Sequence, residues 1–130
     1  MNKKRLIVLY VNNDTIERFG SEILNGLKTI ETRTKRALKS FVNSGIRCGD
    51  VIGIAWHGHI MGFVRFLGVK DYANRAAFNA DFNLHLVSDT SKYGYTEKSG
   101  KCGILLDCPS WCRVPISVTA KHGRTWTEAD

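Results

Sequence analysis

The apolar and polar positions of the amino-terminal region predict a strand followed by a helix. Residues 6–11 form an unbroken apolar run, which is typical of a buried strand. Asp14 and Glu17 then have the D-x-x-E form of a capping box, which opens a helix by satisfying its free amide hydrogens. Gly26 supplies a left-handed stop after that helix. The predicted apolar stripe of the helix consists of residues at helical spacing: Ile16, Phe19, Ile23 and Leu24.

The middle of the chain predicts a strand followed by a short helix, and then a hairpin of two strands. Residues 27–32 are rich in β-branched side chains and predict a strand. Residues 34–43 predict a second short helix, because their apolar side chains share one face between exposed cations. Residues 51–56 and 60–69 predict two strands joined as a hairpin through residues 57–59.

The last third of the chain predicts one helix, a long loop and two closing strands. Residues 75–84 favour a helix, and residues 87–101 have the polar composition of a long exposed loop. Residues 103–107 and 113–118 predict strands that nearby prolines confine to edges or ends of a sheet. Short strands with one good amino-terminal helix favour an α+β fold built on a small β-barrel, rather than a parallel doubly wound sheet.

Length and hydropathy predict one domain, residues 1–130, outside a membrane. The apolar run at residues 6–11 is shorter than the roughly 7 to 15 residues of a secretory signal, and Asn12 follows it directly. No stretch approaches the ~18 apolar residues of a membrane helix. We therefore expect a cytoplasmic protein with no membrane partner and no obligate protein partner.

The cysteines predict free thiols and no metal. Four cysteines would suit two disulfides in an exported protein, but a cytosolic chain keeps them reduced. Cys108 and Cys112 have a C-x3-C spacing with Cys102 and His122 nearby, although structural zinc sites usually show two tightly spaced pairs. We therefore expect no metal site and no cofactor.

The net charge of +7 favours a polyanionic partner but does not identify it. The same excess of lysine and arginine is found on solvated surfaces that serve only solubility. One basic cluster, residues 33–36, comes directly after the predicted strand at residues 27–32.

This predicted strand also carries the candidate chemistry. Glu31 and Arg33 lie two residues apart, so a strand places them on one face with backbones roughly 6.5 to 7 Å apart. Thr29 shares that face, and Lys28 projects from the preceding turn. Together they would give a guanidinium for phosphate or base edges and a carboxylate that accepts from amino groups. An ordinary surface ion pair worth less than about 1 kcal/mol is the alternative.

The pattern G-x-K-x-x-E-x-R at Gly26, Lys28, Glu31 and Arg33 resembles the signature of the ASCH family. Residues 49–54, which read G-D-V-I-G-I, are similar to the strand that follows the signature in that family. A third resemblance is to the tail of the short ASCH proteins of bacteria and phages. It is carried by Gly103 to Asp107, Pro109, Pro115, Ile116, Gly123 and Trp126.

The resemblance implies a PUA-like β-barrel crossed by the first helix, with one or two further short helices and a cleft that binds RNA or a nucleoside derived from it. Some members are hydrolases: an amidohydrolase that deacetylates N4-acetylcytidine, and a metal-assisted ribonuclease. In the amidohydrolase branch the lysine matched by Lys28 assists a threonine nucleophile, and in this chain Glu31 occupies the threonine position. The family's mechanism therefore does not carry over directly, and a hydrolase would use Lys28 and Glu31 to activate either Thr29 or a water.

Two main hypotheses follow: a binding module for RNA or a modified nucleoside, and a hydrolase. The hydrolase would use Lys28, Glu31 and Thr29. A regulatory protein that acts through a protein partner is a third possibility. The residues predicted to contact the substrate are Arg33, Lys35, Arg36, Trp126 and Tyr95, with Trp126 stacking on a base and Tyr95 in a mobile lid.

Overall fold

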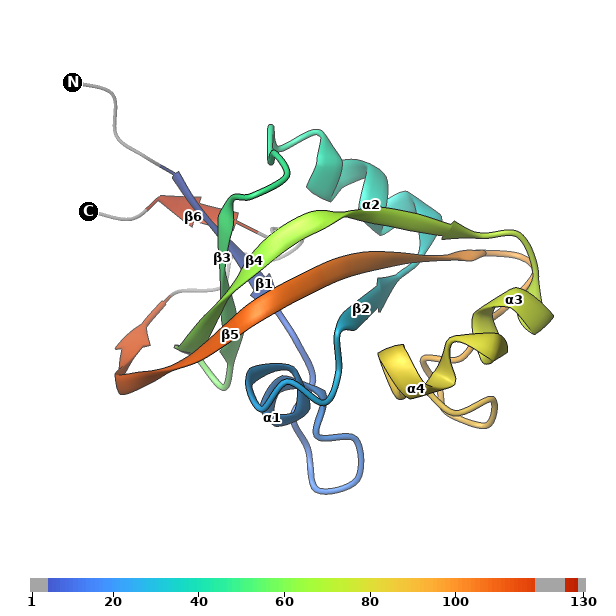
Figure 1. Ribbon diagram of the computed structural model, residues 1–130, viewed down its shortest axis with the longest axis horizontal. Helices are drawn as coiled ribbons and strands as arrows, with labels where there is room; N and C mark the ends of the chain where they lie inside the picture. The colour runs from blue at the N-terminus through green and yellow to red at the C-terminus, as the bar shows by residue number, and fades with distance from the viewer. Residues whose placement is uncertain (1–4, 119–125, 129–130) are drawn as a thin grey trace.

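A curled mixed sheet forms the frame of the molecule, as the computed structural model shows for residues 5–118 and 126–128 (Figure 1). The described strands follow the order β2-β5-β4-β3-β1-β6. β1 and β3 run parallel, whereas the other neighbouring strands run antiparallel. The predicted α+β class is confirmed, and the sheet that was expected to form a small β-barrel curls into a half-barrel. The strands are β1 (Arg5–Tyr10), β2 (Ile30–Arg33), β3 (Val51–Trp56), β4 (His59–Tyr72), β5 (Lys101–Ser117) and β6 (Trp126–Glu128).

The hairpin between β3 and β4 is confirmed. Trp56 pairs with His59, which leaves His57 and Gly58 as a two-residue turn. Both turn residues have positive φ, 51° and 79°, which matches the twist of the flanking strands. Ile52 and Ile54 on the inner face of β3 are fully buried, as expected from their alternation.

β5 is one strand of 17 residues, so the prediction of two separate closing strands was wrong. Phe63 pairs with Ser110 and Arg65 pairs with Asp107, so Cys108 and Pro109 lie opposite a single residue of β4. This is a β-bulge, and Cys108 adopts a φ of 50° within it. Because a bulge leaves one residue outside the regular ladder, the proline is accommodated without ending the strand.

The first helix, α1 (Phe19–Leu24), begins later than the capping box predicted. Asp14 Oδ1 accepts hydrogen bonds from the backbone N–H groups of Ile16 and Glu17, but these bonds close a turn that precedes the helix. Ile16 is 88% exposed and does not belong to the apolar stripe, so that assignment was wrong. Phe19, Ile23 and Leu24 are buried as predicted.

The second predicted helix is confirmed as α2 (Lys35–Val42), and the third is divided. Thr34 caps α2 by accepting from the N–H of Ala37 at 3.2 Å. The predicted helix at residues 75–84 consists of α3 (Arg75–Ala80) and α4 (Phe82–His85), with a break at Asp81. Tyr72 and Lys70 of β4 both donate to Asp81 Oδ2, at 2.8 and 2.6 Å, and hold this residue against the sheet.

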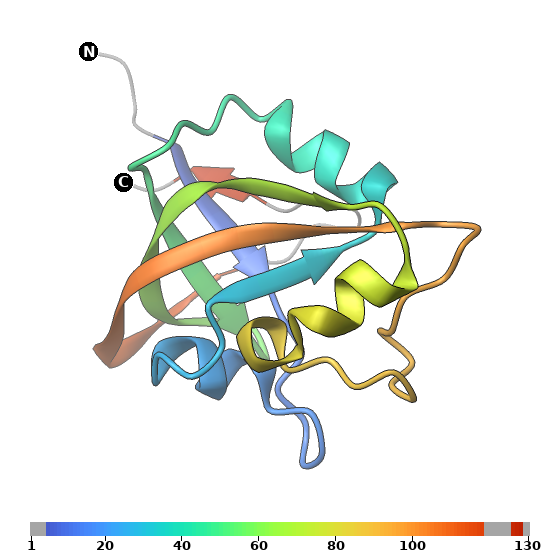
Figure 2. The same ribbon diagram turned by 45° about the vertical axis from the view of Figure 1, so that its right-hand side comes forward.

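α4 lies beside the amino-terminal end of β2 (Figure 2). The N–H of Thr29, which precedes β2, donates to the carbonyl of Leu84 at 2.9 Å. Residues 87–100 form a loop without helix or strand, as predicted. In the part of the chain that the structure describes, no helix has the length and apolar character needed to cross a membrane.

Candidate functional site

The site is built on β2, which lies at the end of the described sheet and pairs with β5. Glu31 lies opposite Ile104 and Arg33 lies opposite Cys102. The two-residue spacing places both side chains on one face, and Arg33 Nη2 donates to Glu31 Oε2 at 2.9 Å. The predicted pairing of these two side chains is therefore confirmed.

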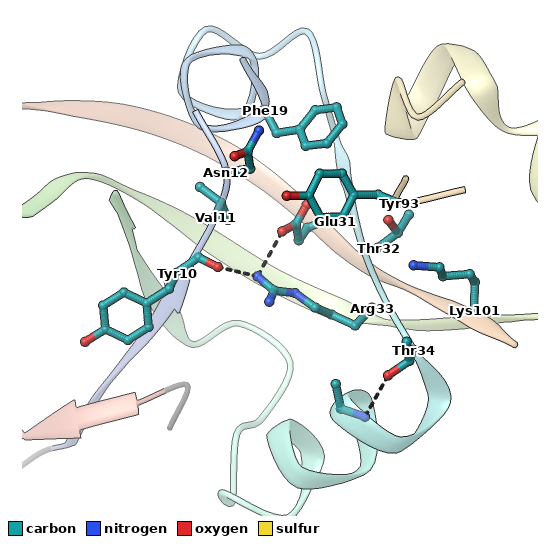
Figure 3. Close-up of a pocket in the computed structure, with 11 residues that line it drawn as sticks. Tyr10, Val11, Asn12, Phe19, Glu31, Thr32, Arg33, Thr34, Tyr93 and Lys101 are labelled. Carbon is teal, nitrogen blue, oxygen red and sulfur yellow. Dashed lines mark hydrogen bonds and ion pairs between the residues drawn. The ribbon is translucent and has the colours of Figure 1, made fainter. Parts of the chain in front are cut away.

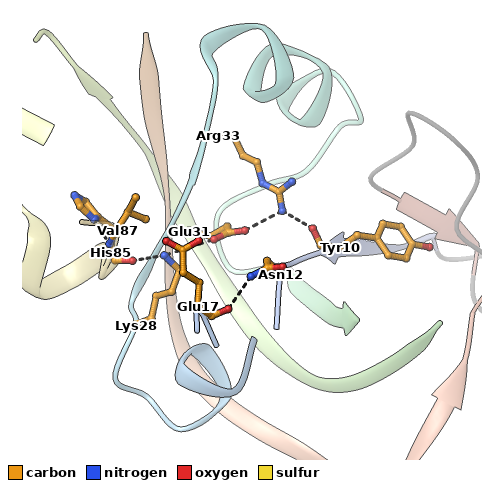
Figure 4. Close-up of polar contacts among 8 residues, drawn as sticks. All are labelled: Tyr10, Asn12, Glu17, Lys28, Glu31, Arg33, His85 and Val87. Atoms are coloured by element: carbon orange, nitrogen blue, oxygen red, sulfur yellow. Dashed lines mark hydrogen bonds and ion pairs between the residues drawn. The ribbon is translucent and has the colours of Figure 1, made fainter. Parts of the chain in front are cut away.

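Glu31 lies between two cations, one for each carboxylate oxygen (Figure 4). Lys28 Nζ is 3.6 Å from Glu31 Oε1, while Arg33 Nη2 contacts Oε2. Arg33 Nη2 also donates to the carbonyl of Tyr10 at 2.7 Å, which ties β2 to the end of β1. The Glu31 side chain is 7% exposed, so its orientation is set by these protein contacts.

Lys28 is an interior residue and its side chain is fully buried. Its ammonium donates to the carbonyl of His85 and lies 4.3 Å from the centre of the Phe19 ring. Burial lowers the pKa of Lys28, and the nearby Glu31 carboxylate opposes that shift. Lys28 thus helps to orient Glu31 from the side of the carboxylate that faces the protein interior.

His85 supports Lys28 and is held in one tautomer. The N–H of Val87 donates to His85 Nδ1 at 2.9 Å, so this nitrogen carries no proton. His85 Nε2 then donates to the carbonyl of Phe78 at 2.6 Å, and the imidazole stacks on the Phe78 ring at 4.1 Å. Burial lowers the pKa of His85, which favours this neutral form.

A cavity of about 420 Å³ opens beside Glu31 and Arg33 (Figure 3). It lies between the end of β1, β2, the start of α2 and the loop at residues 87–100. Its volume is within the roughly 300–1,000 Å³ of small-molecule sites. The residues that line it are Tyr10, Val11, Asn12, Phe19, Glu31, Thr32, Arg33, Thr34, Ala37, Tyr93 and Lys101.

Two aromatic rings and a further lysine complete the cavity wall. Phe19 and Tyr93 meet edge to face with their centres 5.9 Å apart. Lys101, the first residue of β5, is only 8% exposed, and burial lowers its pKa while Glu31 opposes the shift. The cavity therefore offers flat apolar surface next to a carboxylate and two cations.

The predicted hydrolase residues do not all face this cavity. Glu31 lines it, and Lys28 lies behind Glu31. Thr29 precedes β2 and lines a separate pocket of about 150 Å³, whose lining also includes Lys28 and Pro109. The structure thus brings Lys28 and Glu31 together, and it places Thr29 beside Lys28 at another pocket rather than beside Glu31 in the cavity.

The predicted substrate-contacting residues are also divided. Arg33 lines the cavity, whereas Lys35 and Arg36 are exposed on α2 and are not among the lining residues. Lys35 instead lies 3.4 Å from Asp71. Tyr95 is buried against Phe78, with ring centres 6.0 Å apart. The side chain of Trp126 lies outside the residues that the structure describes.

Sequence reasoning missed Lys101, Phe19 and His85 as parts of the site, and it emphasised Tyr95 where Tyr93 lines the cavity. The sequence pattern places Lys101 at the end of the loop predicted at residues 87–101. The one available signal is its position directly before a predicted closing strand. Arg75 pins the loop that carries Tyr93, because it pairs with Asp89 at 3.0 Å and Glu97 at 3.2 Å. No local sequence pattern indicates these contacts.

Cys48, Cys102, Cys108 and Cys112 are free thiols in the structure. Among residues 5–118 and 126–128, no three His, Cys, Asp or Glu side chains gather as ligands for a metal ion. His122, considered with the cysteines for a zinc site, lies outside the described residues. The candidate site is thus a charged and aromatic cavity of protein groups.

No family model matches the sequence, and no curated protein sequence matches it. The structure, however, is similar to the crystal structure of ASCH from Zymomonas mobilis, with a TM-score of 0.61 and 18% identity over 85% of this chain and 72% of that chain. A mutant of that protein gives a TM-score of 0.63 and 19% identity, over 90% of this chain and 77% of the other. A second mutant gives 0.63 and 16%, over 88% and 77%. The chain therefore has the fold of the ASCH proteins.

Proposed function

We propose that this protein binds RNA or a nucleoside derived from it, with a nucleobase inserted in the cavity beside Glu31. The observation that carries the proposal is the position of the Glu31 carboxylate, which Lys28 and Arg33 hold at the cavity wall through separate oxygens. A carboxylate fixed in this way can accept hydrogen bonds from the exocyclic amine or ring N–H of a base.

The other walls of the cavity fit a flat heterocycle. Phe19 and Tyr93 provide ring surface, and stacking of a base on an aromatic side chain contributes about 1–3 kcal/mol in single-strand binders. Arg33 lies next to Glu31 and can donate to a carbonyl oxygen of the same base. The cavity therefore combines stacking with donors and an acceptor for a base edge.

Binding without turnover is favoured over hydrolysis of an acylated nucleoside. Lys28 is enclosed by His85, Glu31 and Phe19, so its ammonium is engaged in holding the site. Thr29 and Lys28 line a different pocket from the one that Glu31 lines, and Thr34 Oγ1 already caps α2. Hydrolysis by Lys28, Glu31 and Thr29 would need a nucleophile next to a base that is free to accept its proton.

The proposal is tested by isothermal titration of the purified protein with nucleosides and a short single-stranded RNA. We expect binding by the wild type, a loss of at least about tenfold in affinity for Glu31→Gln, and a similar loss for Arg33→Ala, since each removes a charge-assisted hydrogen bond worth about 1.5–3 kcal/mol. Arg65→Ala is the matched control, because Arg65 pairs with Asp107 on the exposed surface. Absence of binding by the wild type, or equal losses in all three variants, contradicts the proposal.

Incubation with N4-acetylcytidine, followed by chromatography, separates binding from hydrolysis. The binding proposal predicts that N4-acetylcytidine is recovered unchanged at neutral pH. Release of cytidine that is abolished in Glu31→Gln would instead support the hydrolase.

A further inference from the structure

We propose that the ligand carries a phosphate and that Lys101 is the residue that binds this phosphate in the cavity. The inference rests on the proposed function, because it names the class of ligand: a nucleotide, free or within RNA, rather than an uncharged nucleoside. Within the described residues, Lys101 is largely buried, lies on the cavity wall and forms no direct ion pair.

The charge balance of the cavity is the first support. Both oxygens of Glu31 are engaged, one by Lys28 and one by Arg33. Lys101 is 8% exposed, and among the described residues it forms neither an ion pair nor a hydrogen bond. Glu31 stabilises this ammonium without forming a direct ion pair with it. An anion that enters the cavity would therefore give a largely buried cation the direct contact that it lacks. Figure 3 shows the ammonium of Lys101 turned toward Thr32 and Tyr93 within the cavity.

A second donor in the same cavity is also without a partner. Arg33 Nε is buried and forms no hydrogen bond within the described part of the chain, whereas Nη2 is fully used by Glu31 and Tyr10. Because Arg33 lines the cavity, a change of its side-chain conformation would let this unused donor contact a phosphate oxygen. Arg33 is the last residue of β2 and Lys101 is the first residue of β5, so they approach the cavity from two neighbouring strands.

The amino-terminal end of α2 adds a third attraction for an anion. Thr34, the cap of this eight-residue helix, and Ala37 of its first turn both line the cavity. The first N–H groups of a helix point toward its amino-terminal end, where the helix dipole favours negative charge. The first turn of α2 contains no acidic residue that would compete for this position.

Together, a lysine, an arginine and a helix amino terminus line the cavity alongside Glu31 and the aromatic rings. A tetrahedral phosphate can accept from several directions at once, which suits donors on three elements better than a planar carboxylate does. The cavity thus holds groups that suit a base next to groups that suit an anion. A nucleoside monophosphate presents both.

The test measures, by NMR titration of ¹⁵N-labelled protein, dissociation constants for the four nucleosides, their 5′- and 3′-monophosphates and inorganic phosphate. We expect a monophosphate to bind at least about tenfold more tightly than its nucleoside, the effect of one charge-assisted hydrogen bond. In Lys101→Met this ratio falls to near one. Lys98→Met is the matched control, because Lys98 is exposed three residues earlier and carries the same charge, and it is expected to keep the ratio.

The outcomes distinguish this inference from the function on which it rests. Equal affinity for nucleoside and monophosphate in the wild type overturns the phosphate site and leaves nucleobase binding intact. Binding of inorganic phosphate that depends on Lys101, without binding of any nucleoside or nucleotide, supports the phosphate site and overturns nucleobase binding. Absence of all binding overturns both, and an equal loss in Lys98→Met overturns the specific role of Lys101.

Discussion

The ammonium of Lys28 lies 3.6 Å from the carboxylate of Glu31 in the interior, with side-chain exposures of 0% and 7%. The pair belongs to a line of contacts that runs from the His85 carbonyl to Lys28, Glu31, Arg33 and the Tyr10 carbonyl. This line connects α4 with β1 across β2. The same contacts that fix the site therefore also hold three parts of the fold together.

The two members of this pair are expected to differ in their effect on stability. Glu31→Leu leaves the buried Lys28 ammonium without its counter-charge and is expected to lower the free energy of unfolding by about 3–5 kcal/mol. Lys28→Met removes the buried charge itself, and Glu31 keeps Arg33 as a partner. We therefore expect a smaller loss for Lys28→Met.

Urea unfolding of the two single variants and of the double variant Lys28→Met/Glu31→Leu measures this difference. The double variant should lose less than the sum of the single losses, because the two side chains interact. A Lys28→Met loss equal to that of Glu31→Leu, with additive effects, would show that the pair is not coupled.

His85 predicts a loss of stability in mildly acidic solution. The pKa of His85 is lowered in the folded protein by burial, so below its ordinary value of 6.5 the unfolded chain binds a proton that the folded chain does not. The free energy of unfolding should therefore fall as the pH drops from 6.5, by at most about 1.4 kcal/mol per pH unit. Urea unfolding at pH 7.5 and 5.5 measures it.

The histidine variants identify the source of that pH dependence. His85→Gln should show a weaker dependence between pH 7.5 and 5.5, whereas His59→Gln, at the exposed β3–β4 turn, should behave as the wild type. Carboxylates with a lowered pKa, such as Asp81 and Asp107, change the free energy of unfolding only at a pH below this range. A dependence that persists unchanged in His85→Gln would rule out this origin.

Lys101 predicts that phosphate binding weakens in alkaline solution. Burial holds the pKa of Lys101 below its ordinary value of 10.5, and only the protonated ammonium attracts a phosphate. The affinity for a nucleoside monophosphate should thus decline as the pH rises toward 10. Lys101→Arg keeps its charge and should retain the affinity over the same range; titrations at pH 7, 8.5 and 10 compare the two proteins, and parallel curves would contradict the prediction.

The sheet has no room for a side chain at Gly62. A Cβ at this position would overlap the carbonyl oxygen of Ser110 and lie 2.6 Å from Leu24 Cδ2. Gly62→Ala is therefore expected to destabilise the protein by about 1–3 kcal/mol. Gly53→Ala is the control, because its Cβ would lie 3.4 Å from Ile60 and Val8; thermal unfolding should show the larger loss for Gly62→Ala, and equal losses would count against the packing of α1 on β4.

Much of the fold could be predicted because local patterns decide it. The alternation of Ile52 and Ile54, the turn at His57 and Gly58, and the Thr34 cap each depend on residues close in sequence. The unbroken β5 could not be predicted, because the bulge at Cys108 and Pro109 depends on pairing with β4. The same holds for the break at Asp81, which Lys70 and Tyr72 stabilise from another element.

The candidate site could be predicted only where strand geometry determines it. The shared face of Glu31 and Arg33 follows from their spacing in β2. The burial of Lys28 depends on α4 and Phe19, and the place of Lys101 depends on the register of β5 against β2. These contacts join segments far apart in the sequence, so no local pattern signals them.

The most direct test of the central claim is to map a bound nucleotide onto the protein by ¹H–¹⁵N NMR. On addition of a nucleoside monophosphate, we expect the largest chemical shift changes at Glu31, Thr32, Arg33, Tyr93 and Lys101, which surround the cavity. Changes confined to surfaces away from these residues, or no changes at millimolar nucleotide, would contradict the claim that this cavity is the binding site.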